Sequence, residues 1–366
     1  MKLHIFNPEH DIALAANLSN YTAPHVGRQL RSELGFIPAL WADDGDFVLV
    51  DDVPAAVEHI RHIRKYAADV LFVTLDDLTQ FAGFTPGELI VCPWGWDRSL
   101  ARQLKNAGIP DKLLPTDNHI ETIRLLSNRS WAAKTLLPSL VQLSHKMVGK
   151  AVYYTSIDML AQAIGKDFNC VLKAPWSSSG RGIRYIHSEE NWQRNITWIK
   201  NVIARQEGIM CEPYYNKVKD FGMEFESDGT QVRYVGLSVF KTVNGAYTGS
   251  VVATEEAKLE MLTHFVSSDL LERVKEEICN RLSSNFCRIY QGPFGIDMMI
   301  VRGQKEDDFM LHPCVELNLR RTMGHVALSF NATDEDPQRL MRIVYDGRYH
   351  LKISDTNENV INNSLI

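Results

Sequence analysis

The sequence has little of what marks secreted, membrane-spanning or nucleic-acid-binding proteins. Its 366 residues include 6 cysteines but no Cys-x-x-Cys pair, which favours reduced, buried thiols over a disulfide framework or a zinc site. Every hydrophobic run is shorter than the roughly 20 residues that a membrane span needs. The formal net charge of -6 argues against general nucleic-acid binding, which depends on a basic surface. We therefore expect a cytoplasmic protein that binds neither membranes nor nucleic acid.

The first 115 residues alternate short β-type runs with helical patterns. The predicted strands are Lys2 to Phe6, Phe47 to Val50, Val70 to Leu75 and Glu88 to Cys92. The predicted helices are His25 to Leu34, Ala55 to Ala67 and Arg98 to Ala107. This alternation predicts an α/β domain with a largely parallel sheet, and the apolar run at the N-terminus is too short for a signal peptide.

Two loops follow predicted strands in this domain, Asn7 to Asp11 and Pro93 to Asp97. Parallel sheets bind ligands beyond the carboxyl ends of their strands, so either loop could line a pocket. The alternative is structural: Asp11 caps a helix, and the tryptophans of the second loop pack in the core.

The remaining residues predict two further domains, 116–208 and 209–366. An amphipathic stretch from Asn118 to Leu140 marks the junction with domain 1–115. Predicted strands follow at Lys150 to Tyr154, Cys170 to Ala174, Ile183 to Ile186, Ile209 to Tyr215, Phe221 to Glu226 and Gln231 to Lys241. Predicted helices cover Ser156 to Ile164, Glu189 to Arg205 and Leu270 to Leu282. The later strands favour an antiparallel sheet, with a turn at 227–229.

A hairpin predicted near the C-terminus carries three oxygen ligands. The polar stretch Arg302 to Asp308 separates two apolar runs and reads as their connection. Folding there places Asp297 opposite Glu316, and alternation along the strand puts Asn318 on the same face as Glu316. Hard oxygen donors without cysteine are typical of a magnesium site that serves a nucleotide.

A second motif follows the predicted strand that ends at Lys173. The loop Ser177 to Gly182 is rich in small residues, namely Ser178, Ser179, Gly180 and Gly182. Its backbone N–H groups and hydroxyls could fold over phosphate oxygens, with Lys173 as a point charge. The alternative is a plain hairpin loop with an exposed lysine.

A third motif lies where one predicted strand ends and another begins. Backbone groups around Glu212, Pro213 and Tyr214 could pair with an adenine edge, and Asp220 could accept ribose hydroxyls. Farther along, Lys241 begins a Gly- and hydroxyl-rich loop that ends a long strand, and we predict that it contacts the γ-phosphate. The alternatives are a loop acid at Asp220 and a simple turn after Lys241.

The order of these motifs resembles the ATP-grasp superfamily of carboxylate-amine ligases, which includes D-alanyl-D-alanine ligase, biotin carboxylase and glutathione synthetase. The resemblance covers roughly residues 118–330. It implies an ATP-grasp fold, with two α+β subdomains clasping ATP, preceded by a Rossmann-like α/β domain. It also implies the following roles: Lys173 and the small-residue loop as the lid, Glu212 to Tyr214 as the adenine hinge, Asp220 for ribose, and Asp297, Glu316 and Asn318 as magnesium ligands.

Two further basic positions come from the same resemblance. Arg320 completes a Glu-x-Asn-x-Arg pattern that begins at Glu316, which implies contact with the substrate carboxylate or with acyl-phosphate oxygens. Family members also carry a basic residue about 40 positions before the lid lysine. Arg129 is the preferred match and Lys134, one turn later, is its competitor.

The activity that this resemblance implies is an ATP-dependent ligase. ATP, with one or two Mg²⁺ ions for which Mn²⁺ can substitute, would activate a small-molecule or peptide carboxylate as an acyl phosphate, which an amine or other nucleophile then attacks. The alternatives are a small-molecule phosphotransferase and a non-catalytic nucleotide-binding protein. The sequence leaves the acid, the nucleophile and the oligomeric state open, a homodimer included.

Overall fold

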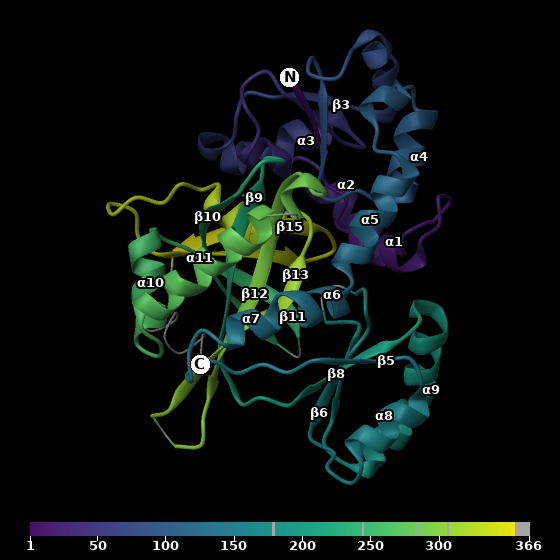
Figure 1. Ribbon diagram of the computed structural model, residues 1–366. Coiled ribbons are helices and arrows are strands. Elements are labelled where there is room, and N and C mark those ends of the chain that lie inside the picture. The colour runs from purple at the N-terminus through teal and green to yellow at the C-terminus, as the bar shows by residue number, and fades with distance from the viewer. Residues whose placement is uncertain (178–179, 244, 285, 306, 356–366) are drawn as a thin grey trace. The chain divides into compact units, whose positions relative to one another are not determined.

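The computed structural model describes residues 1–177, 180–243, 245–284, 286–305 and 307–355, which form two compact units (Figure 1). The first unit comprises Met1–Arg124, Gly249–Thr254 and 320–355, and the second comprises Leu125–Thr248 and Glu255–Leu319. The sequence assigned 320–355 to its last domain, and the three-domain division stays a prediction. No helix within the described ranges has the length and apolar character needed to cross a bilayer.

A parallel sheet forms the centre of the first unit, in the order β3-β2-β1-β4. Its strands are β1 (Lys2–Ile5), β2 (Phe47–Leu49), β3 (Leu71–Val73) and β4 (Ile90–Pro93). The predicted parallel sheet is therefore confirmed. The helices of this part are α1 (His10–Ala16), α2 (His25–Leu34), α3 (Val53–Ile60) and α4 (Arg98–Asn106), with 3-10 turns η1 (Ile37–Leu40), η2 (Arg61–Tyr66), η3 (Leu75–Gly83) and η4 (Asp111–Leu113).

The helix predicted from Ala55 to Ala67 is shorter and begins earlier than expected. Asp52 accepts a hydrogen bond from the Ala55 amide at 2.7 Å, and Pro54 lies in the first turn. Both residues favour a helix start at Val53. After Ile60 the chain tightens into the 3-10 turn η2.

A C-terminal segment completes the core of the first unit. It contains α12 (Met323–Leu328), β14 (Arg339–Tyr345) and β15 (Tyr349–Asp355), and the two strands form an antiparallel hairpin. Val326, Phe330 and Met341 pack in one buried cluster with Phe6 and Val48. Both strands lie outside the elements predicted from the sequence, and in each of them charged residues interrupt the apolar ones.

Strand β11 (Ala246–Val252) corrects the sequence prediction of a loop after Lys241. Its last residues pair with β14, with Ser250 opposite Met341 and Val252 opposite Arg339. Val251 and Val252 are almost fully buried. The Gly- and hydroxyl-rich composition favoured a loop, but pairing and burial of the β-branched residues produce a strand.

The second unit contains a small antiparallel sheet in the order β5-β8-β6-β7. Its strands are β5 (Val152–Tyr154), β6 (Cys170–Lys173), β7 (Ile183–Ile186) and β8 (Ile209–Pro213). Helices α8 (Ile157–Ile164) and α9 (Glu189–Gln206) pack along it (Figure 1), and each begins at a capping serine, Ser156 or Ser188. Leu172, Ile186 and Ile199 form the core between them.

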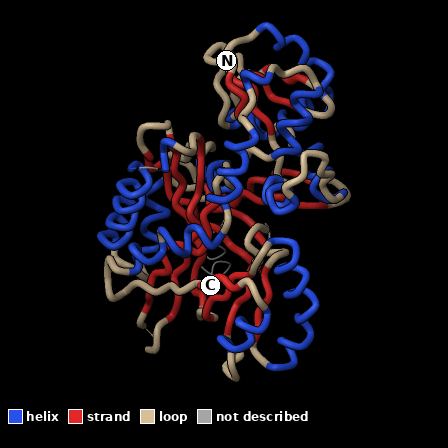
Figure 2. Tube along the Cα trace, turned by 45° about the vertical axis from the view of Figure 1, so that its right-hand side comes forward, coloured by secondary structure: helices blue, strands red, loops and turns tan. Residues whose placement is uncertain are grey.

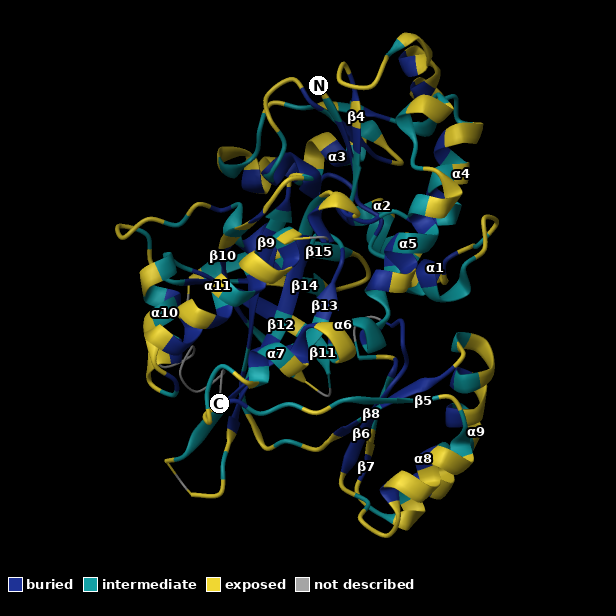
Figure 3. Cartoon of the chain, viewed as in Figure 1, coloured by how far each residue is buried: buried dark blue, intermediate teal, exposed yellow. Residues whose placement is uncertain are grey.

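A larger antiparallel sheet of the second unit has the order β13-β12-β9-β10. Its strands are β9 (Lys217–Ser227), β10 (Val232–Val243), β12 (Gly292–Arg302) and β13 (Phe309–Asn318). Figure 2 shows its strands in red, and Figure 3 shows that they are mostly buried. Phe221, Phe225 and Phe294 are fully buried, and Phe294 contacts the ring of Phe286.

The amphipathic stretch Asn118 to Leu140 divides into α5 (Asp117–Ser127), α6 (Arg129–Thr135) and α7 (Leu137–Val141). Asn128 caps α6 by accepting from the Ser130 amide at 2.8 Å, and Pro138 lies in the first turn of α7. Because these residues start new helices, the amphipathic stretch is not one continuous helix. The other helices of the second unit are α10 (Glu255–Thr263), α11 (Ser268–Ser284) and the 3-10 turn η5 (Phe286–Arg288).

Candidate active site

A pocket of about 530 Å³ lies in the second unit. Its volume is within the range typical of small-molecule sites. Both sheets of this unit contribute to its walls. The predicted site residues that line it are Lys173, Glu212, Pro213, Tyr214, Asp220, Asp297 and Glu316. The structure therefore brings residues of all three sequence motifs to one cavity.

The two carboxylates on the hairpin of β12 and β13 have the predicted register. Asp297 of β12 lies opposite Glu316 of β13, and Gly295 lies opposite Asn318. Directly opposed residues share a face, so Asp297, Glu316 and Asn318 lie on one side of the sheet. Among the described residues no three His, Cys, Asp or Glu side chains cluster as a metal site. The predicted trio has two carboxylates, and its third member is an amide.

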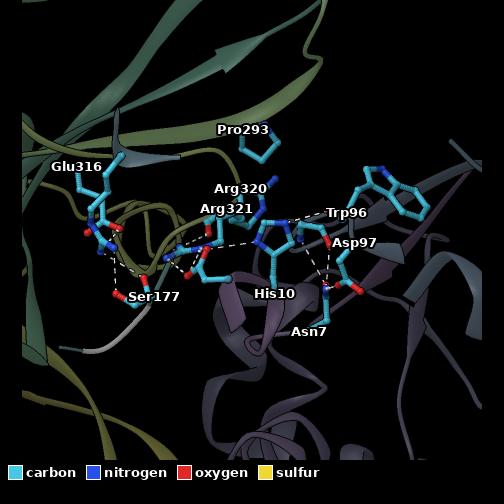
Figure 4. Close-up of polar contacts among 12 residues, drawn as sticks. Asn7, His10, Trp96, Asp97, Ser177, Pro293, Glu316, Arg320 and Arg321 are labelled. Carbon is cyan, nitrogen blue, oxygen red and sulfur yellow. Dashed lines mark hydrogen bonds and ion pairs between the residues drawn. The ribbon is translucent and has the colours of Figure 1, made fainter. Parts of the chain in front are cut away.

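Arg129 links this hairpin to the start of the lid loop. Its side chain is buried, and its Nη2 lies 2.6 Å from Glu316 Oε1 (Figure 4). Its Nη1 donates to the carbonyl oxygen of Ala174 at 2.5 Å and to Ser177 Oγ at 2.9 Å. Lys134, its competitor, is exposed and lies over the ring of Tyr153. Of the two, Arg129 is the one that contacts a predicted metal ligand.

Lys173 forms a buried ion pair with Glu212. Lys173 Nζ lies 2.6 Å from Glu212 Oε2, and both side chains are less than a tenth exposed. The register of β6 with β8 produces this contact, because Val171 is opposite Glu212 and Lys173 is opposite Met210. The pair joins the predicted lid lysine to the first residue of the predicted adenine hinge.

The described part of the lid contains two tightly packed glycines. Gly180 has a φ of +71°, and a Cβ there would lie 2.7 Å from backbone atoms of Gly245. A Cβ at Gly182 would lie 2.2 Å from Ser177 Oγ. Both positions therefore require glycine. The predicted contacts of Ser178 and Ser179 lie outside the described residues.

The hinge and the predicted ribose acid already have partners within the protein. The Tyr214 amide donates to the Asn169 carbonyl at 3.0 Å. Asp220 lies inside β9, not at its entrance as predicted, because the strand begins at Lys217. Its carboxylate accepts from Lys217 Nζ at 2.5 Å and from Thr242 Oγ1 at 2.6 Å.

The two residues predicted to be catalytic are not among those that line this pocket. Lys241 lies between Phe240 and Thr242, which do line it. Because side chains alternate along a strand, Lys241 belongs to the opposite face of β10. Arg320 belongs to the first unit, where its Nε and Nη2 contact the Asp11 carboxylate at 2.8–3.1 Å (Figure 4). Their predicted roles stay predictions.

Asp11 forms an ion pair with Arg320 and does not cap a helix. Burial by itself raises the pKa of Asp11, but the charge of Arg320 and contacts with His10 outweigh it and hold that pKa well below its usual range. Asp11 lies in the first turn of α1 and does not cap that helix, whose N-cap is Glu9. The prediction of a capping role for Asp11 is therefore wrong.

The two loops of the first unit meet at the carboxyl ends of β1 and β4. Asn7 Nδ2 donates to the Gly95 carbonyl at 2.8 Å, and His10 Nε2 lies 3.1 Å from the Trp96 carbonyl (Figure 4). Gly95 is needed there, because a Cβ would lie 2.5 Å from the His10 ring. Trp94 packs against Phe6 in the core.

A second cavity, of about 650 Å³, lies in the first unit. Glu9, Asp51, Leu75 and Asp97, which follow β1, β2, β3 and β4 respectively, all line it. Both loops therefore contribute residues to a pocket, in agreement with the prediction that either loop could line one. Asp97 also caps α4, accepting from the Ser99 and Leu100 amides at 2.9 Å.

Several residues that line the first pocket escaped the sequence analysis. Two of them are Tyr185, which lies in β7, and His187, which directly follows that strand. Their rings stack with the centroids 6.3 Å apart. His187 also contacts the ring of Tyr214 at 4.6 Å. Burial and the nearby Glu212 charge raise the pKa of Tyr215 to about 12. The spacing of two between Tyr185 and His187 was the signal available in the sequence. It indicates a binding site only together with the facing segment Glu212 to Tyr214.

Comparison of the sequence finds no matching family model and no matching curated protein. Comparison of the structure finds N5-carboxyaminoimidazole synthetase from Staphylococcus aureus, complexed with ADP, at a TM-score of 0.50 and 13% identity, over 99% of this chain and 95% of that one. A biotin carboxylase complex from Campylobacter jejuni gives 0.51 and 13%, over 93% and 75% of the chains.

A third match is the biotin carboxylase domain of Hydrogenobacter thermophilus 2-oxoglutarate carboxylase, complexed with MgADP, ADP and bicarbonate. Its TM-score is 0.51 at 13% identity, over 93% of this chain and 74% of that one. These proteins share the ATP-grasp fold. The chain therefore has the ATP-grasp fold, and the fold that the sequence motifs imply is confirmed.

Proposed function

We propose that the protein is an ATP-dependent, Mg²⁺-requiring ligase that activates a substrate carboxylate as an acyl phosphate for attack by an amine. One observation carries this proposal: Asp297 and Glu316 lie opposite each other in a pocket that also contains Lys173, Glu212 and Asp220. The solved structures with the same fold include complexes with ADP and with MgADP and bicarbonate. Those ligands support a nucleotide in the present pocket.

The proposed magnesium ligands have suitable chemistry. Asp297, Glu316 and Asn318 offer carboxylate and amide oxygens, which are the donors that Mg²⁺ prefers. Glu316 Oε1 accepts from Arg129, and a carboxylate retains a second oxygen for a metal. Bound Mg²⁺ would neutralise charge on the phosphate oxygens during transfer.

The other proposed roles concern the nucleotide. Lys173 and the glycines of the lid would bind phosphate oxygens, and the segment Glu212 to Tyr214, with the nearby aromatic rings, would hold the base. Asp220 would accept the ribose hydroxyls in place of Lys217 or Thr242. Closure of the lid would exclude water from a reactive acyl phosphate.

Arg129 and Arg320 are the proposed guanidinium groups of the reaction. Arg129 contacts Glu316 and the lid, so it can hold the metal ligand and reach a phosphate from the same position. Arg320 would bind the substrate carboxylate after exchanging one of its contacts with Asp11. Lys241 is the proposed residue with the least support, because it is not among the residues that line the pocket.

The decisive experiment traps the activated carboxylate. The protein is incubated with ATP, Mg²⁺, hydroxylamine and a panel of carboxylic acids, and hydroxamate and ADP are measured together. We expect equal amounts of both for the correct acid, and their loss in Glu316→Gln. The control Glu226→Gln changes a half-exposed acid on β9 that pairs with Arg233, and it should keep the activity.

The alternative activities give different products. A phosphotransferase yields ADP and a stable phosphorylated compound without hydroxamate, and a non-catalytic nucleotide-binding protein yields no ADP with any acid. Normal hydroxamate formation by Glu316→Gln would show that the proposed metal site is wrong.

A further inference from the structure

The pocket of the first unit, of about 650 Å³, lies where the strand order of the parallel sheet changes direction. In the order β3-β2-β1-β4, the chain passes from β1 to β2 and β3 on one side and then returns to β4 on the other. Ligands of such sheets bind in the crevice at this point, beyond the carboxyl ends of the strands. Glu9, which follows β1, and Asp97, which follows β4, both line the pocket. The topology therefore provides a ligand site that the function proposed above does not use.

Two buried carboxylates form the deep end of this pocket. The Glu9 side chain is 11% exposed, and Asp97 is 3% exposed. Glu9 Oε1 lies 3.0 Å from Arg31 Nη1, but Glu9 Oε2 has no hydrogen-bond partner within the described part of the chain. A buried oxygen without a partner is unfavourable, so such groups usually pair with a water molecule or a ligand. The last torsion of a glutamate side chain is soft, so a small rotation turns this oxygen to a ligand in the pocket.

The negative charge at the deep end is only partly compensated. Burial raises the pKa of Glu9, although the charge of Arg31 opposes this effect. Burial likewise raises the pKa of Asp97, against the charges of His10 and Arg31 and two backbone hydrogen bonds. The positive charges already present therefore do not fully balance the two carboxylates. A cationic group in the pocket would stabilise both of them.

The rim of the same pocket carries two exposed arginines, Arg28 and Arg102. Among the described residues, the Arg28 side chain takes part in no hydrogen bond or ion pair. The Arg102 guanidinium donates to the hydroxyl of Ser19 at 3.1 Å. One acid, Asp51, also lies at the rim, so one arginine is in excess there. Because a guanidinium binds a carboxylate through two parallel hydrogen bonds, the rim favours an anionic group.

We propose that this pocket binds a zwitterionic ligand of the amino-acid or short-peptide class, with its ammonium group at Glu9 and Asp97 and its carboxylate at the rim arginines. A ligand without net charge suits the pocket, because its charged lining residues are three arginines and three acids: Arg28, Arg31, Arg102, Glu9, Asp51 and Asp97. A simple anion would leave the deep carboxylates uncompensated, and a simple cation would leave the rim arginines unpaired. All residues that line this pocket belong to the first unit, so the inference does not depend on the ligase activity.

The test measures binding to the full chain without nucleotide by isothermal titration calorimetry. The probes are the standard amino acids and glycylglycine, and comparison of glycine with glycylglycine separates free amino acids from peptides. We expect at least one probe to bind with a dissociation constant below about 1 mM. Its amide lacks the carboxylate and its N-acetyl derivative lacks the ammonium group. Each derivative should bind about tenfold more weakly or worse, because each loses a charged hydrogen bond.

Two substitutions should weaken binding of the same probe by about tenfold. Glu9→Gln removes a charge from the deep end but keeps an oxygen that can accept from Arg31. Arg28→Gln removes an exposed guanidinium without an internal partner among the described residues, so this variant should fold normally. The controls Glu58→Gln and Arg61→Gln change an exposed ion pair of the same unit that lies outside the pocket. Both controls should bind the probe like the wild type.

Three results would overturn the proposal. The first is that no probe binds, and the second is that binding is unchanged in Arg28→Gln or Glu9→Gln. The third is equal binding of a derivative: the amide would assign the pocket to a cation, and the N-acetyl form would assign it to an anion. Binding is measured without ATP, so its absence would leave the ligase proposal intact. Absence of hydroxamate formation would likewise leave this proposal intact.

Discussion

The guanidinium of Arg129 lies 2.6 Å from the carboxylate of Glu316 and also holds the Ala174 carbonyl and the Ser177 hydroxyl. Residues 187 positions apart in sequence are thereby joined at the proposed metal site. One buried cation thus connects the strand that carries a proposed metal ligand with the loop that is proposed to close over phosphate.

Arg129→Met should therefore destabilise the protein by about 3 kcal/mol, because it leaves buried acceptors without their donor. It should also reduce hydroxamate formation at least tenfold. Urea unfolding and the trapping assay measure the two effects. Lys134→Met is the matched control, since Lys134 is exposed and one turn away, and it should change stability by less than about 1 kcal/mol. Equal effects of the two substitutions would remove the special role of Arg129.

The buried pair of Lys173 and Glu212 should behave as one unit. Lys173→Met and Glu212→Gln should each lower the free energy of unfolding by about 3–5 kcal/mol, because each leaves a buried polar group without its partner. The double variant should lose much less stability than the sum of the two single losses. Unfolding in guanidinium chloride measures this coupling. The exposed pair of Lys105 and Asp111, at 60% and 70% side-chain exposure, should couple by no more than about 1 kcal/mol. Additive effects at Lys173 and Glu212 would contradict the prediction.

Stability in acid should depend on Asp11. Its pKa is lowered in the folded protein, so its pairing with Arg320 stabilises the fold fully above the unfolded-state pKa, near 3.8. That contribution is lost as the pH falls below 3.8, because protonation then favours the unfolded chain. We expect Asp11→Asn to be less stable than the wild type at pH 6 and to lose less stability between pH 5 and pH 2. Urea unfolding across this range, with the exposed Asp111→Asn as control, measures the difference. Parallel pH profiles for wild type and Asp11→Asn would contradict it.

Gly95→Ala should disrupt the loop after β4. Its Cβ would lie 2.5 Å from the His10 ring, so either the ring or the loop must move, at a cost of about 1–3 kcal/mol. Gly83→Ala is the control, because a Cβ there meets no atom within 4 Å. Thermal unfolding of both variants gives the comparison. A Gly95→Ala variant as stable as Gly83→Ala would show that the loop accommodates the change.

Much of the fold could be predicted because local patterns and burial agree. The parallel strands of the first unit and the hairpin that pairs Asp297 with Glu316 follow from apolar runs separated by polar connections. The prediction of a loop after Lys241 failed because tertiary contacts overrode composition. Strand β11 is rich in glycine and hydroxyl residues, yet its pairing with β14 makes it extended. The stretch from Asn118 to Leu140 breaks because Asn128 and Pro138 start new helices.

The sequence alone determined the fold and the register of the hairpin that pairs Asp297 with Glu316, because a period of two along each strand fixes which side chains share a face. Only the tertiary structure decided which charges meet. Residues far apart in the chain form the pairs Arg129–Glu316, Lys173–Glu212 and Asp11–Arg320. Contacts between distant segments depend on how whole elements pack, and no local pattern encodes that packing.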